Sequence, residues 1–66
     1  MIKMKCVRST YALFSAGEVY DFKRAGEAGR FTVYEYEREG ALYRFGLDDA
    51  GANETDGNFM QFEEVK

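Results

Sequence analysis

Alternation of apolar and polar residues is the dominant pattern in this chain, and it favours β-strands over helices. In residues 2–7 the apolar side chains of Ile2, Met4 and Cys6 fall on one side, as in a strand with one buried face. Residues 18–23 repeat this alternation after a long loop over residues 8–17, and residues 25–29 are expected to be a further loop. Apolar residues do not recur at three- and four-residue spacing over any window long enough for a helix, so no helix is predicted.

The clearest element is a β-hairpin formed by residues 31–38 and 41–47 around Glu39-Gly40. A two-residue connection pairs positions whose numbers add up to 79, which places Tyr36 opposite Tyr43 and Tyr34 opposite Phe45 on one face. A four-residue loop would keep the same faces. We reject a three-residue loop, because a one-residue slip moves every side chain to the other face of the sheet.

The C-terminal third begins with a polar stretch. Residues 48–58 contain glycines and no large apolar side chain, so an exposed loop is expected. Phe59 and Phe62 are three residues apart, which predicts a short 3₁₀ turn before a last strand over residues 62–65. The chain is therefore expected to be a single all-β domain of five strands.

This order of elements resembles the Src-homology-3-like (SH3-like) small barrel, which implies a five-stranded barrel with a short 3₁₀ turn before the last strand. Locally, Lys5-Cys6-Val7, residues 13–20 and the terminal Phe62-Glu63-Glu64-Val65 are similar to small uncharacterised phage and prophage proteins. The similarity implies a viral setting and no activity. The proline-peptide groove of eukaryotic SH3 domains is not expected, because the chain has no Trp and residues 41–45 lie in the wrong strand for that signature.

Burial in so short a chain must come mainly from its aromatic rings. A chain of 66 residues buries only about 60% of its unfolded surface, and five Tyr and six Phe are the largest groups available. The residues expected in the core are Met4, Cys6, Val19 or Tyr20, Phe31 or Val33, Phe45, Phe59 and Phe62.

The cysteine content and the charge indicate the setting of the protein. Cys6 is the only cysteine, so no intrachain disulfide is possible, and a buried structural thiol in a reducing, cytoplasmic compartment is expected. The sequence contains no apolar run of the kind that predicts a signal peptide or a membrane span. Residues 1–24 carry five basic and two acidic side chains, whereas residues 47–66 carry six acidic and one basic.

The chain offers no recognisable catalytic or metal site. Acid–base and triad catalysis usually depend on His, which is absent. The acidic residues of the hairpin, Glu35, Glu37 and Glu39, are typical of a solvated strand face. The acids and Asn53 in residues 48–56 do not have the spacing of a calcium loop. The sequence therefore predicts no enzyme, no cofactor and no metal.

We expect a non-catalytic protein-binding module, a phage-encoded effector that occupies a surface of a host protein. Its partner is expected to be an unknown host or phage protein, and the chain itself a monomer or weak homodimer. Tyr is enriched at interfaces, and loops on a rigid scaffold concentrate binding residues. The predicted contact residues are Tyr11, Leu13, Phe14, Asp48, Asp49, Glu54 and Asp56. An alternative is that Leu13 and Phe14 fold down to fill one end of the barrel. The alternative functions are nucleic-acid binding and mimicry of nucleic acid by the acidic C-terminal third.

Overall fold

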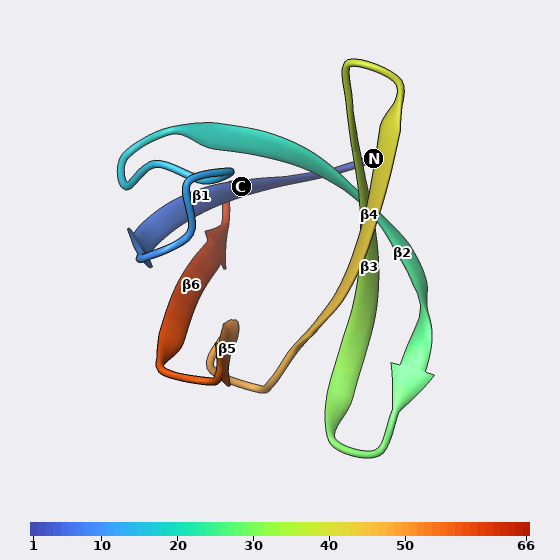
Figure 1. The fold of residues 1–66 in the computed structure, drawn as a ribbon. Helices are drawn as coiled ribbons and strands as arrows, with labels where there is room; N and C mark the ends of the chain where they lie inside the picture. Colours follow the sequence, from blue (N-terminus) through green and yellow to red (C-terminus); the bar gives the residue numbers. More distant parts are fainter.

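The alternating segments of the chain form six β-strands, joined by tight turns and one longer loop (Figure 1). The structure, a computed structural model, describes all residues from 1 to 66. The strands are β1 (Ile2–Ser9), β2 (Val19–Ala28), β3 (Phe31–Arg38), β4 (Ala41–Leu47), β5 (Ala52–Thr55) and β6 (Asn58–Glu64). They form one antiparallel sheet in the order β4-β3-β2-β1-β6-β5, so β4 and β5 are its two edges.

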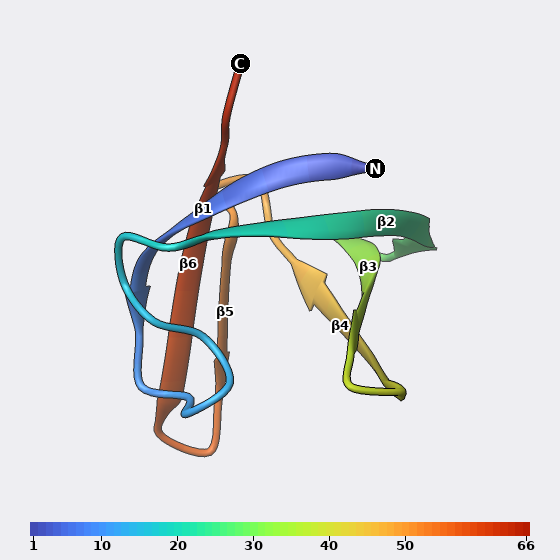
Figure 2. The same cartoon turned by 90° about the horizontal axis from the view of Figure 1, so that it is seen from above.

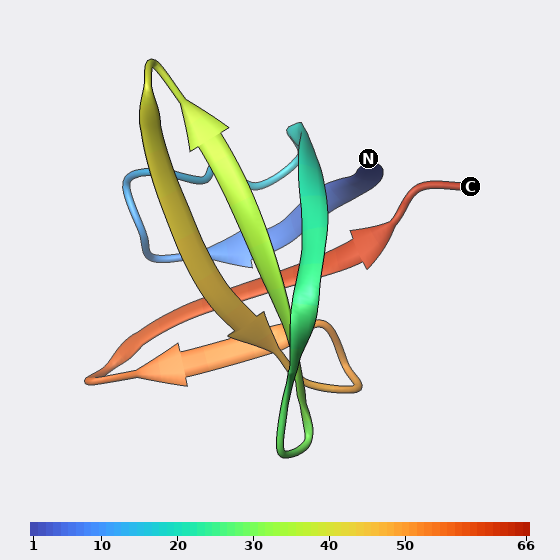
Figure 3. The same cartoon turned by 90° about the vertical axis from the view of Figure 1, so that its right-hand side faces the viewer.

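The sheet curls into a half-barrel because β2 changes its partner halfway along its length. Residues 19–22 of β2 pair with β1, and from Lys23 onward β2 pairs with β3. Irregularities at Val7 in β1 and at Ala25 in β2 mark bulges, which bend a strand and increase its twist. Figure 3 shows the result: the β3–β4 hairpin crosses β5 and β6 at a steep angle.

Alternate side chains of the curled sheet point into one core. Its seven buried residues are Met4, Cys6, Phe14, Phe22, Leu47, Met60 and Phe62. Phe14 and Phe22 each lie edge-on to Phe62 at a centroid distance of 5.0 Å. Phe14 comes from the loop between β1 and β2, so the loop supplies the ring that fills the space left inside the half-barrel.

The β3–β4 hairpin has the predicted register. Tyr34 lies opposite Phe45 and Tyr36 opposite Tyr43, as a two-residue connection requires. The turn residues Glu39 and Gly40 have φ values of 51° and 82°, which is the left-handed backbone of a type I′ turn. The all-β prediction is likewise confirmed, since the structure contains strands and turns and no helix.

The five strands and the 3₁₀ turn are not confirmed, because the region predicted as an exposed loop contains a strand. β5 lies within it and pairs with β6 through a hairpin whose turn is Asp56-Gly57, with φ values of 52° and 82°. Residues 59–62 are extended within β6, so there is no 3₁₀ turn at this position. The predicted loop over residues 25–29 shortens to the turn after Ala28, because residues 25–28 belong to β2.

The predicted core is right at Met4, Cys6 and Phe62, and Phe45 packs against it half-buried. Of the pair left open in β2, Tyr20 packs against the core, whereas Val19 is exposed.

Two further core predictions are wrong. In β3 the side chains that pack against the core are Tyr34 and Tyr36, and the residues proposed there, Phe31 and Val33, alternate onto the other face. In β6 the core residue is Met60. Phe59 is half-buried on the opposite side, where the guanidinium of Arg8 lies 5.0 Å from its ring centroid.

Candidate functional site

The open side of the half-barrel lies between the edge strands β4 and β5. In a two-residue hairpin the two residues that flank the turn form a hydrogen-bonded pair. From there, hydrogen-bonded and non-hydrogen-bonded pairs alternate along the two strands. Leu42, Arg44 and Gly46 of β4 therefore direct their N–H and C=O groups away from β3. No backbone hydrogen bond from β5 or from a loop reaches Leu42 or Arg44, so this stretch of β4 is a free strand edge.

The two edges are joined at one end only. The N–H of Asp48 donates to the carbonyl of Ala52 at 3.0 Å, and the N–H of Ala52 donates to Asp48 Oδ1 at 3.0 Å. Asn53 Nδ2 donates to the carbonyl of Gly46 at 2.6 Å. From this closed end the edges diverge toward the two hairpin turns, which lie apart at the same end of the molecule (Figure 2). The opening is therefore wedge-shaped.

Mainly apolar side chains line the wedge and form a cleft of about 390 Å³. They come from the first loop, β4, β5 and β6: Tyr11, Leu13, Phe14, Tyr43, Arg44, Phe45, Asn53, Thr55 and Met60. Phe14 and Met60 are buried, so they form the floor. Tyr43 is 39% exposed, and its ring stacks on Tyr36 at a centroid distance of 6.5 Å. The cleft thus has an apolar floor and an aromatic wall that faces solvent.

The loop that forms one wall of the cleft, residues 10–18, is fixed at several points. The N–H of Thr10 donates to the carbonyl of Phe59 at 2.8 Å, and the hydroxyl of Thr10 accepts from the N–H of Phe59 at 2.8 Å. Arg38, next to the β3–β4 turn, donates to the carbonyl of Leu13 at 3.4 Å. Since the wall is already ordered, a ligand would not have to order it on binding.

Net negative charge borders the cleft. Two nitrogens of Arg44 donate to one carboxylate oxygen of Glu35, at 2.5 and 3.1 Å, and Arg38 is bound to the loop carbonyl. Both basic side chains of this region are therefore engaged within the protein. The bordering strands and turns also carry exposed carboxylates that form no ion pair: Glu37, Glu39, Glu54 and Asp56.

The structure brings together only part of the predicted contact surface. Tyr11 and Leu13 are half-buried and line the cleft, as expected of contact residues in the first loop. Phe14 is only 4% exposed and belongs to the core, so its assignment to the exposed surface is corrected. The alternative, in which Phe14 folds down to fill the barrel, describes the structure.

The predicted acidic contact residues lie away from the cleft lining. Asp48 and Asp49 line a separate depression at the closed end, beside the last residues of β6. Asp48 has a structural role there, because its carboxylate accepts the backbone N–H groups of the turn that leads into β5. Glu54 and Asp56 are exposed on β5 and on its turn, at the border of the cleft.

Sequence reasoning missed the opposite wall of the cleft. The sequence predicts Tyr43 only as the cross-strand partner of Tyr36, and Phe45 as a core residue. Asn53 and Thr55 fall within the predicted exposed loop. The Asp56-Gly57 dipeptide between two short segments is nevertheless a strong hairpin signal.

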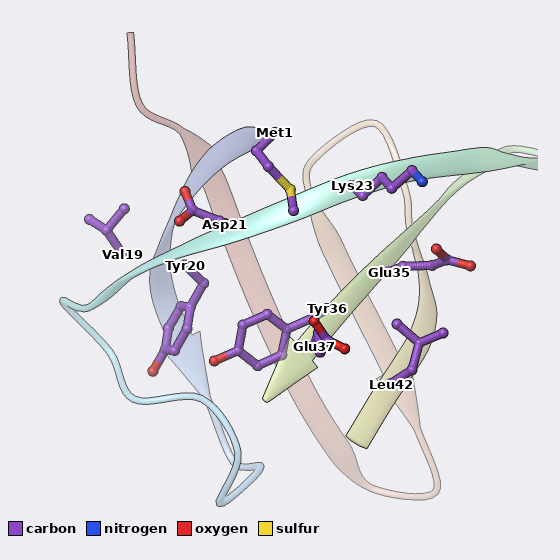
Figure 4. A pocket seen from close by; sticks show the side chains of 9 residues that line it. All are labelled: Met1, Val19, Tyr20, Asp21, Lys23, Glu35, Tyr36, Glu37 and Leu42. Atoms are coloured by element: carbon purple, nitrogen blue, oxygen red, sulfur yellow. The ribbon is translucent and has the colours of Figure 1, made fainter. Parts of the chain in front are cut away.

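A second depression, of about 520 Å³, opens where β2 and β3 separate (Figure 4). The rings of Tyr20 and Tyr36 lie beside one another there, 5.6 Å apart and nearly perpendicular. The rest of its lining is mostly charged or exposed: Met1, Val19, Asp21, Lys23, Glu35, Glu37 and Leu42. The cleft between β4 and β5 is therefore the more apolar of the two.

Neither cleft is lined by a thiol. The one thiol, on Cys6, is fully buried in the core, and this burial raises its pKa. A raised pKa disfavours the thiolate, which is the reactive form. No group of three or more His, Cys, Asp or Glu side chains is arranged to hold a metal ion. The arrangement supports binding through shape, apolar contact and backbone groups.

Comparison with protein-family models, curated proteins and solved structures finds no match to this chain. The similarity to phage proteins and to SH3-like barrels therefore stays a prediction from the sequence. No helix in the structure is long and apolar enough to cross a membrane.

Proposed function

We propose that this protein is a protein-binding module that receives its partner in the cleft between β4 and β5. The observation that carries the proposal is the coincidence of a free strand edge with an apolar cleft. Proteins usually protect an edge strand, but this one presents Tyr43, 39% exposed, toward the cleft, and Leu42, 61% exposed, on the opposite face of the strand. Exposed apolar groups beside unpaired backbone groups are typical of a contact surface.

The alternative of nucleic-acid binding has less support, because many of the basic side chains are engaged within the protein. Ion pairs join Lys3 to Asp21, Arg24 to Glu27 and Arg44 to Glu35. Arg8 and Arg30 lie over phenylalanine rings. The net charge of −3 also disfavours the phosphate contacts on which nucleic-acid binding depends.

The partner would be a host or phage protein met in the cytoplasm, bound by a monomer or weak homodimer with an SH3-like scaffold. These points rest on the resemblance described above and on the absence of cysteine pairs and apolar segments in the sequence.

A selection from a random peptide library tests the proposed function, using the folded protein as bait. We expect selected peptides to lose roughly tenfold or more in affinity on Tyr43→Ser, which removes the aromatic wall of the cleft. The matched control is Val19→Ser, because Val19 is 48% exposed and lines the other depression.

Two results would contradict the proposal. One is loss of peptide binding on Val19→Ser with full binding on Tyr43→Ser, which would move the site to the β2–β3 depression. The other is tight, salt-sensitive binding of oligonucleotides in place of peptides, since phosphate contacts make affinity fall steeply with salt.

A further inference from the structure

We propose that the occupant of the cleft is an extended polypeptide segment that adds to the edge of β4 as a further strand. Its alternate side chains would be apolar toward the cleft and basic toward solvent. This inference rests on the proposed function and goes beyond it, because it states the backbone conformation of the partner and the chemistry of its two faces.

The free edge of β4 requires a partner with backbone groups of its own to offer. Leu42 and Arg44 each present one N–H and one C=O outward, and no backbone group of the protein meets them. An extended chain matches such an edge, because its donors and acceptors repeat at the same two-residue interval. A helix uses its own N–H and C=O groups internally and leaves the edge unpaired.

The joined end of the wedge limits the length of the added strand. The carbonyl of Gly46 already accepts from Asn53, and Asp48 pairs with Ala52 just beyond it. The segment would enter from the open end and pair with β4 at Leu42 and Arg44. A short segment is therefore enough to fill the edge.

The two faces of the added strand would meet different surroundings. Successive side chains of a strand point to opposite sides, so every second one would face the cleft. There it would meet Tyr11, Leu13 and Tyr43 over the floor formed by Phe14. Apolar side chains suit this side of the segment.

The outward face of the added strand would lie in negative surroundings. It would run beside Glu54 on β5, with Glu37, Glu39 and Asp56 nearby on the hairpins that border the opening, and none of the four forms an ion pair. Arg44 is paired with Glu35, and the single positive charge of Arg38, which is hydrogen-bonded to a neutral carbonyl, leaves these four carboxylates in excess. Lysine or arginine at the outward positions complements this charge, whereas a second copy of the chain would bring the same carboxylates against themselves.

Amide hydrogen exchange with a designed peptide tests the inference. The probe is a capped peptide of alternating lysine and valine, and its matched control carries glutamate in place of lysine. We expect only the lysine peptide to slow exchange at the amides of Leu42 and Arg44, by roughly tenfold or more at saturation. The amides of Tyr43 and Phe45, which already face β3, serve as internal controls and should change little.

Two variants separate the backbone contribution from the charge contribution. Leu42→Pro removes an outward N–H at an edge position that tolerates proline, so peptide binding should be lost, whereas Leu42→Thr should retain it. Glu54→Lys, on the exposed face of β5, should shift preference from the lysine toward the glutamate peptide.

The failures of the inference and of the proposed function are distinguishable. Equal binding of both peptides overturns the basic partner. Binding that depends on Tyr43 but leaves the Leu42 and Arg44 amides unprotected overturns strand addition and leaves a protein-binding cleft. If these amides are protected without peptide, and the protection increases with protein concentration, the occupant is a second copy of the chain. This result also overturns the inference. If library-selected peptides and both designed peptides all leave Tyr43 and its neighbours unaffected, the proposed function itself fails.

Discussion

At the scale of single residues, Gly51 is the glycine that tolerates least change. It lies in the turn between β4 and β5, and its carbonyl accepts the N–H of Phe62 at 2.8 Å. Its φ is 73°, and a Cβ at this position would lie 2.1 Å from the carbonyl oxygen of Phe62. The turn that joins the two edges of the half-barrel therefore depends on a glycine for both its backbone conformation and its close approach to β6.

Replacing Gly51 with alanine is expected to be strongly destabilising. Strain at positive φ adds to a backbone clash, so we expect Gly51→Ala to lower the free energy of unfolding by about 3 kcal/mol or more. Urea unfolding measures the loss. The control is Gly29→Ala, where φ is 60° and nothing lies within 4 Å of the added Cβ, so a loss of only about 1 kcal/mol is expected. Equal losses at the two sites would show that the close approach to Phe62 does not exist.

Cys6 is expected to react slowly in the folded protein. It is fully buried, and burial raises the pKa of its thiol, so both access and the thiolate fraction are reduced. Labelling by a thiol reagent should be slower by a factor of roughly 100 or more than in denaturant, because it requires opening of the core. Rapid labelling of the native protein would mean that the core is open at β1.

The same pKa shift gives the sign of a pH effect on stability. A raised pKa in the folded state means that the unfolded state loses its thiol proton first. Stability should therefore fall as pH rises above the ordinary thiol value of 9.0, and Cys6→Ala should lack this part of the decrease. A larger alkaline loss in Cys6→Ala than in the natural protein would contradict the assignment.

At the scale of elements, the two short hairpins share one turn geometry with different residues. The β3–β4 turn is Glu39-Gly40 and the β5–β6 turn is Asp56-Gly57, and all four residues have positive φ. Asp tolerates the left-handed region better than Glu, whose side chain gives no local compensation. The β3–β4 turn is therefore the less well adapted of the two.

Glu39→Asn is expected to stabilise the protein by about 0.5–1 kcal/mol, because Asn-Gly is a preferred type I′ sequence. Asp56→Asn, at nearly the same φ in the other hairpin, should change stability by less. Thermal or urea unfolding measures both variants. A loss of stability in Glu39→Asn would show that the Glu39 carboxylate has a stabilising contact that outweighs its strain.

The elements also show what the sequence could predict. The β3–β4 hairpin was predictable because its aromatic residues alternate and only one register keeps them on one face. β5 was missed because its four residues bring no large apolar side chain, so that only the turn dipeptide marks it. The second half of β2 was missed for a related reason: its residues are exposed on both faces, and pairing with β3 holds them in the sheet.

At the scale of the whole molecule, the curvature of the sheet decides where the binding site lies. The bulges at Val7 and Ala25 and the change of partner along β2 produce the half-barrel, and no pattern in the sequence marks them. The first loop was predictable as a source of contact residues, since Tyr11 and Leu13 do line the cleft. The geometry of the cleft was not predictable, because the cleft exists only where two distant edges approach each other without pairing.

Amide hydrogen exchange of the free protein shows whether the half-barrel is open at β4. A free edge requires an alternating pattern along this strand. The amides of Leu42 and Arg44 should exchange roughly a hundredfold faster than those of Tyr43 and Phe45, which face β3, at any protein concentration. Uniform protection at all four positions in the dilute, free protein would mean that the edge of β4 is already covered, and that the binding site is not there.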